Sequence, residues 1–146
     1  MPTPRSIRFD PRVLERLHAS AKRHEGASVS ALVNRYVDEA IRMEEHPGVF
    51  FRSGPAGRRA VLVGGPDVWE VIRAVKDVRR ADPSLPADGV IAAVSESSGV
   101  SSARISIAIG YWSAYPDEID EWIEAAESEE AAAEARWRRE RELLIS

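Results

Sequence analysis

With 146 residues, of which 44% are hydrophobic and 30% charged, the chain has room for one or two small domains of ordinary soluble composition. The absence of cysteine excludes disulfides, thiolate catalysis and cysteine-ligated zinc, and fits a reducing cytoplasm. No apolar run approaches the roughly 18 residues needed to span a bilayer, so we expect no membrane partner.

The net charge of −4 is unevenly distributed along the chain. Residues 1–116 hold sixteen Lys/Arg against thirteen Asp/Glu, whereas residues 117–146 hold four against eleven. This asymmetry favours phosphate binding by residues 1–116 and binding of a different partner by the acidic residues 117–146. The alternative is that the acidic stretch is a solvated helix face.

The first predicted element is a strand, because Ser6-Ile7-Arg8-Phe9 alternates polar and apolar residues. Two helices follow, with apolar positions Leu14, Leu17 and Ala21 after Asp10-Pro11, and Val29, Leu32, Val33, Tyr36, Val37, Ala40 and Ile41 after Ser28. No second strand lies nearby, so pairing with a second chain is needed to satisfy the strand's backbone groups. We expect a two-fold dimer in which an antiparallel ribbon lies under four helices and presents Ser6 and Arg8 to the DNA major groove.

The strings from Arg5 to Leu17 and from Gly26 to Val33 resemble the ribbon-helix-helix family of bacterial DNA-binding proteins, the MetJ/Arc/CopG superfamily. The resemblance covers residues 3–45. It implies that Ser6 and Arg8 contact base edges, with Pro4 in the third place, and that a DNA phosphate lies at the start of the second helix. That start is formed by Ser28, Val29 and Ser30, whose free N–H groups and helix dipole attract anions. A plain surface charge at Arg8 and a simple N-cap at Ser28 are the alternatives.

The middle of the chain predicts a second compact unit. His46-Pro47-Gly48 ends the second helix, and two short β runs, Val49–Arg52 and Arg58–Val63, flank a five-residue Gly/Pro loop and predict a hairpin. Helices are expected from Pro66-Asp67 to Asp82-Pro83, over Asp88–Ser95 and over Ser102–Tyr115. The last two, joined by a glycine-bearing turn at Ser97–Ser101, resemble a helix-turn-helix. Its exposed positions are Ser101, Ser102, Arg104 and Ser106, which either read DNA or belong to a unit that serves packing and dimer formation.

This middle region also resembles a domain of unassigned role found in bacterial antitoxins. The matching strings are His46-Pro47-Gly48-Val49, Gly57-Arg58-Arg59-Ala60, Asp67-Val68-Trp69-Glu70-Val71 and Ala108-Ile109-Gly110-Tyr111-Trp112. The resemblance implies a VapB-type antitoxin whose partner is a PIN-like ribonuclease toxin.

A long helix is expected from Pro116-Asp117-Glu118 to Ile145, about 40 Å in length. Ile119, Trp122, Ile123 and Ala126 mark a face that packs on the middle unit, and an Ala/Glu-rich stretch follows. Beyond it, candidate partner-binding residues cluster: Trp137, Arg138, Arg139, Arg141, Leu143 and Leu144. By the antitoxin resemblance, the three arginines are candidates to pair with the carboxylates of a PIN-type magnesium site. Self-packing of the tail and disorder are the alternatives.

The sequence therefore predicts a mostly α fold with short β structure (α+β) and three segments. These are a ribbon-helix-helix domain (1–46), a β-hairpin plus helical domain (47–116) and a C-terminal toxin-binding helix (117–146). The expected function is that of an antitoxin: a cytoplasmic homodimer or higher oligomer that binds double-stranded operator DNA and a cognate toxin. No catalytic, metal or cofactor site is expected. A stand-alone repressor and a plasmid-partition accessory protein are the alternatives.

Overall fold

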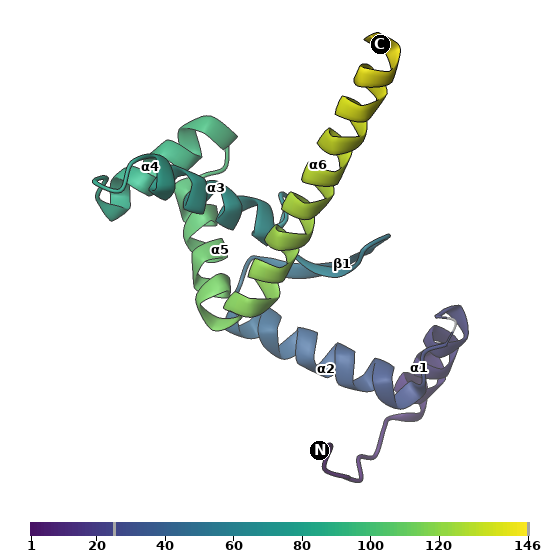
Figure 1. The fold of residues 1–146 in the computed structure, drawn as a ribbon. Helices are drawn as coiled ribbons and strands as arrows, with labels where there is room; N and C mark the ends of the chain where they lie inside the picture. Colours follow the sequence, from purple (N-terminus) through teal and green to yellow (C-terminus); the bar gives the residue numbers. More distant parts are fainter. Residues whose placement is uncertain (25, 146) are drawn as a thin grey trace. The chain divides into compact units, whose positions relative to one another are not determined.

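The structure, a computed structural model, describes residues 1–24 and 26–145 (Figure 1). The chain divides into two compact units, Met1–Arg42 and Met43–Ser146. The described residues form six helices and one two-stranded antiparallel sheet, so the expectation of a mostly helical fold with little β structure is confirmed. None of the described helices is both long enough and apolar enough to cross a membrane.

The first unit begins with residues 1–10, which are exposed and have no regular secondary structure. The strand expected at Ser6–Phe9 is therefore not formed within one chain, where no neighbouring strand exists to receive its hydrogen bonds. Helix α1 (Pro11–Arg23) follows directly. Its start is set by Pro11 in the first turn and by Asp10, whose carboxylate accepts a 2.8 Å hydrogen bond from the Arg12 amide.

Helix α2 (Val29–Glu45) begins after Ser28, whose Oγ accepts a 3.1 Å hydrogen bond from the Ala31 amide, as expected of an N-cap. It pairs with α1 through few buried groups. Leu17 and Leu32 are buried, and the hydroxyls of Ser20 and Tyr36 are 2.5 Å apart. The first unit thus has a very small core for two helices of this length.

The second unit begins with the hairpin of β1 (Val49–Gly54) and β2 (Gly57–Leu62). The strands pair up to Gly54 opposite Gly57, so the connection has two residues and the expected five-residue loop is wrong. The reason is that Ser53 and Gly54 continue the ladder, and Gly57 accommodates a φ of 125° that closes the turn.

Four helices complete the second unit: α3 (Val68–Ala81), α4 (Ala87–Ser98), α5 (Ser102–Ala114) and α6 (Pro116–Ile145). Helix α3 packs against α4, α5, α6 and strand β2 and is the centre of the unit (Figure 1). The core consists of apolar side chains from the sheet and all four helices: Val49, Ala60, Leu62, Val68, Val71, Ile72, Val94, Val100, Ile105, Ala108, Tyr111, Ile119 and Ile123.

The connection between α4 and α5 is shorter than predicted. Helix α4 continues through Ser97 and Ser98, and Gly99 ends it with a φ of 75°. Ser101 then begins α5 by accepting a 3.3 Å hydrogen bond from the Arg104 amide. The turn between α4 and α5 is thus produced by one left-handed glycine and one serine cap.

Candidate nucleic-acid interface and partner-binding helix

The DNA contacts predicted for the first unit are on its N-terminal segment and at the start of α2. Ser6 and Arg8 are exposed on the N-terminal segment. That segment and the start of α2 line one groove of about 580 Å³, to which Ile7 and Phe9 contribute from the segment and Val29 and Ser30 from the helix. The candidate base-reading segment and the candidate phosphate-binding helix end are therefore neighbours.

The start of α2 has the geometry of an anion site. The first amides of any helix lack a carbonyl partner one turn earlier, and the helix dipole places positive potential there. Ser28 and Ser30 are exposed and Val29 is half-buried, and the Ser28 hydroxyl accepts a hydrogen bond from the Ala31 amide. The surrounding unit is basic, since residues 1–42 hold eight Lys/Arg against five Asp/Glu.

The first unit also exposes an apolar face. Ile7 is 65% exposed and Phe9 37%, although their alternation with Ser6 and Arg8 predicts burial. Along the helices, five further large side chains are exposed: Val13, Leu14, Tyr36, Val37 and Ile41. So many exposed large apolar side chains are unusual on an isolated unit and are typical of a surface covered by another chain.

Tyr36 joins this face to the small interior of the unit. Its hydroxyl lies against Ser20, and the Arg35 guanidinium lies 5.3 Å from its ring centroid. The hydrogen bond with Ser20, aided by Arg35, lowers the pKa of the Tyr36 phenol. We interpret this cluster as a polar link between the two helices, because Ser20 lies on α1 and Tyr36 on α2.

The helix-turn-helix-like part of the second unit is less suited to DNA. Ser101, Ser102 and Ser106 are exposed, but Arg104 is half-buried and donates a 2.8 Å hydrogen bond to the Val63 carbonyl at the end of β2. The groove between α4 and α5 contains Asp88 and no basic residue. A phosphate approaching this groove would meet a carboxylate, which favours the packing alternative for this part of the chain.

Helix α6 is fixed to the second unit along its first half. Ile119 and Ile123 enter the core, and the Asp120 carboxylate accepts hydrogen bonds from Lys76 at 2.5 Å and from the Trp112 indole at 2.9 Å. The Lys76 ammonium, with the Trp112 indole, lowers the pKa of Asp120.

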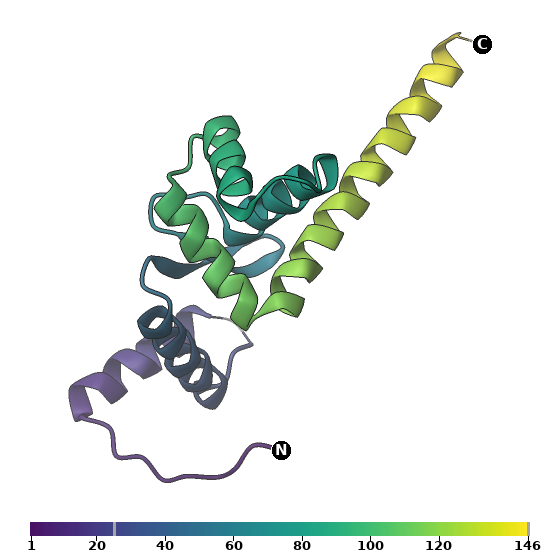
Figure 2. The same ribbon diagram turned by 90° about the vertical axis from the view of Figure 1, so that its left-hand side faces the viewer.

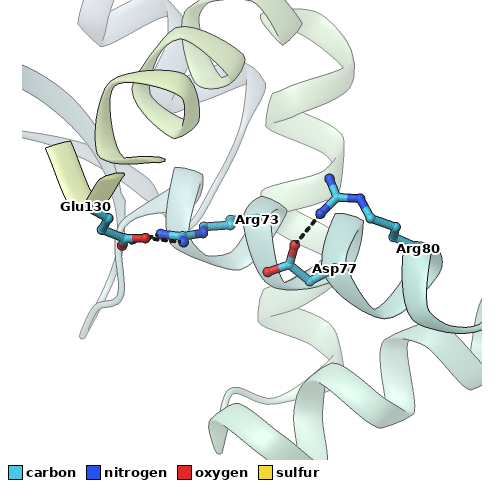
Figure 3. Close-up of polar contacts among 4 residues, drawn as sticks. All are labelled: Arg73, Asp77, Arg80 and Glu130. Carbon is cyan, nitrogen blue, oxygen red and sulfur yellow. Dashed lines mark hydrogen bonds and ion pairs between the residues drawn. The ribbon is translucent and has the colours of Figure 1, made fainter. Parts of the chain in front are cut away.

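The last described attachment of α6 to the body is at Glu130. Its carboxylate receives two hydrogen bonds from Arg73 of α3, at 2.6 and 2.7 Å (Figure 3). Figure 3 also shows Asp77 pairing with Arg80 along α3, whereas Arg73 reaches across to α6. This pair lowers the pKa of Glu130 and raises that of Arg73. The sequence reasoning missed Arg73 and Lys76, whose spacing of three residues on a helix was the available signal.

The second half of α6 extends beyond the other helices of the unit (Figure 2). Trp137 is 55% exposed and Leu144 is 84% exposed, and Leu143 is also exposed. The Arg141 guanidinium lies 5.0 Å from the Trp137 ring centroid, and Arg138 pairs with Glu134 at 2.5 Å. The candidate partner-binding residues are thus brought together on one accessible helical segment, and Arg139 is exposed beside them.

His46 follows Glu44 and Glu45 at the end of α2. Its ring packs edge-on against Tyr111 and Tyr115, at centroid distances of 5.3 and 6.0 Å. Among residues 1–24 and 26–145, no three His, Asp or Glu side chains are grouped as metal ligands would be.

Comparison of the chain with known protein families, with curated proteins and with solved structures found no match. The functional assignment therefore rests on the physical features of the two units.

Proposed function

We propose that this protein is a dimeric DNA-binding regulator of the antitoxin type, which binds operator DNA through its N-terminal unit and a toxin protein through the second half of α6. The observation that carries the proposal is the exposed segment Ser6–Phe9 beside the start of α2, on a unit with an uncovered apolar face. The proposal gives the chain binding roles in the cytoplasm and no catalysis.

Pairing of two N-terminal segments explains three features together. It supplies the strand hydrogen bonds that one chain lacks, and it buries Ile7 and Phe9 beneath a two-stranded ribbon. It also leaves Ser6 and Arg8 on the outer face of the ribbon, at a width that fits the major groove. The exposed apolar residues of α1 and α2 would then form the core between the two protomers.

The start of α2 completes the DNA-binding surface. A phosphate bound by the Val29 and Ser30 amides would fix the register of the ribbon, while Arg8 and Ser6 read base edges. For base reading and phosphate binding to act on one DNA site, the N-terminal segment and the start of α2 must lie on the same side of the unit. Their shared groove supports this arrangement.

The toxin-binding part of the proposal rests on the accessible half of α6. Trp137 and Leu144 are large apolar side chains that are 55% and 84% exposed, and arginines flank them. A partner with an apolar groove and carboxylates at its rim would suit this segment, which is the chemistry of a ribonuclease site built on acidic magnesium ligands. An arginine placed there would displace the metal.

Oligomeric state and DNA binding test the first part together. Phe9→Asp should abolish pairing of the N-terminal units, seen as a smaller oligomer in sedimentation, and abolish binding to upstream DNA, because it places a charge under the ribbon. Val63→Asp is the control, since Val63 is also an exposed apolar residue but belongs to the second unit. A wild-type chain that is monomeric at micromolar concentration and binds no DNA would refute the proposal.

Co-purification with the product of the adjacent reading frame tests the second part. Trp137→Ala combined with Leu144→Ala should abolish retention while leaving DNA binding unchanged. Equal retention of the double variant and the wild type would contradict a role of α6 in toxin binding.

A further inference from the structure

The face of α6 that points away from the body carries a regular row of six residues. We call it the outer row: Glu121, Ala125, Ser128, Ala132, Ala135 and Arg139. Their spacing alternates between four and three residues, which keeps them on one side of a helix. All are exposed except Ala135, which is half-buried.

The outer row lies opposite the residues that attach α6 to the second unit. A member of the row follows nine residues after each of Ile119, Ile123 and Glu130. Nine residues are about two and a half helical turns, so the two sets lie on opposite sides of the helix. The row is therefore turned away from α3, and its exposed side chains are accessible to another molecule.

The charges along α6 change sign about halfway. Residues 117–130 contain eight carboxylates and no basic residue, and four arginines lie within residues 136–141. On and beside the outer row this order places Glu121 and Glu124 at one end and Arg136 and Arg139 at the other. Within the described part of the chain, none of these four side chains forms an ion pair, so their charges are available to a partner.

We propose that two copies of the chain pair through their α6 helices, antiparallel, along the outer row. Reversal of one helix about a two-fold axis level with Glu130 places Glu121 of each copy opposite Arg139 of the other. The same operation places Ala125 opposite Ala135 and Ser128 opposite Ala132. The small side chains in the middle allow the two helices to approach closely, and the charges at the ends fix their direction.

We assign the partner of this face as a second copy of the chain. The order of charges along α6, acidic then basic, is complementary to the same order in an antiparallel copy. A parallel arrangement places carboxylate against carboxylate, and an unrelated protein has no reason to match this order. The Trp137 side of α6 stays accessible in such a pair, because Trp137 follows Ile119 by about five whole turns and so lies on the attachment side. The pairing therefore adds a self-association surface to the proposed function: it leaves Trp137 and Leu144 for the toxin and uses Arg139, one of the candidate toxin-binding arginines, for the second copy.

Mixed cysteine cross-linking tests the pairing, since the natural chain has no cysteine. Full-length Ser128→Cys and Ala132→Cys proteins are mixed and oxidised. The mixture should yield a covalent dimer several-fold faster than either protein alone, because identical positions lie about 6 Å out of register along the helix axes. Ala133→Cys mixed with Ser128→Cys is the matched control and should give only background cross-linking.

Charge exchange supplies the second readout. Glu121→Arg or Arg139→Glu alone should slow the mixed cross-link, and the double exchange should restore it. The cross-link should also persist with Phe9→Asp in both proteins, which separates this pairing from the N-terminal dimer. Failure of the mixture to exceed the control, faster cross-linking of Ser128→Cys alone, no rescue by the double exchange, or loss with Phe9→Asp would each overturn the proposal.

Discussion

Replacing Ile119 by alanine should strongly destabilise the second unit, because this side chain is only 1% exposed and holds α6 in the core. Isoleucine to alanine removes three carbon atoms, which corresponds to about 2.4 kcal/mol at 0.8 kcal/mol per buried methylene. The cavity that remains raises the expected cost to about 3–4 kcal/mol. Urea unfolding followed by tryptophan fluorescence should show a midpoint lowered by about 1.5–2 M, for a slope near 2 kcal/mol per molar.

Leu144→Ala is the matched control on the same helix. Leu144 is 84% exposed, so the same type of truncation should change the free energy of unfolding by less than about 0.5 kcal/mol. Equal midpoint shifts for the two variants would refute the division of α6 into an attached half and an accessible half. That division supports both the toxin-binding proposal and the antiparallel pairing.

Three further predictions concern DNA binding, the second unit and pH. Arg8→Ala should weaken operator binding by about 1–3 kcal/mol in a gel-shift titration and relax base preference. Arg12→Ala should weaken binding less, and equally on all DNA sequences. Wild-type affinity that is independent of salt concentration would contradict the phosphate contacts. Arg104→Ala should leave operator affinity unchanged but lower unfolding stability by about 1 kcal/mol, because it removes the hydrogen bond to the Val63 carbonyl; a loss of affinity instead would assign α5 to DNA. The pKa of the Asp120 carboxyl is lowered in the folded state, so the ionised form stabilises the fold. This contribution to the free energy of unfolding is fully present at pH values above the ordinary carboxyl pKa, and it is lost as the pH falls through the folded-state pKa. The melting temperature measured below about pH 4 should therefore fall less steeply in Asp120→Asn than in the wild type, and parallel pH profiles would show that this carboxylate is not responsible.

Local signals in the sequence were sufficient for most helix starts. Asp10 before Pro11, Ser28 and Ser101 each offer a side-chain oxygen to the amides of the following turn, and each begins a helix in the structure. Periodic apolar residues likewise predicted the packed face of α6 through Ile119 and Ile123. These features depend on neighbours within one or two turns, so a single sequence contains them.

The hairpin turn and the segment at residues 6–9 show where local signals fail. The Gly/Pro-rich stretch at residues 53–57 predicted a wide loop, but cross-strand hydrogen bonds extend the ladder to Gly54 and Gly57. The alternation at Ser6–Phe9 predicted a strand, and within one chain it has no partner with which to form one. In both cases the outcome depends on a second strand, which sequence periodicity does not specify.

The sequence by itself determined the order of the elements, the lone alternating segment before two helices and the change of charge along the last helix. Only the tertiary structure decided that Arg73 and Lys76 attach α6 up to Glu130, that Arg104 is used within the second unit, and that the N-terminal segment lies beside the start of α2. The physical reason is the range of the interactions: caps and periodicity act over a few residues, whereas ion pairs between helices join side chains more than forty positions apart.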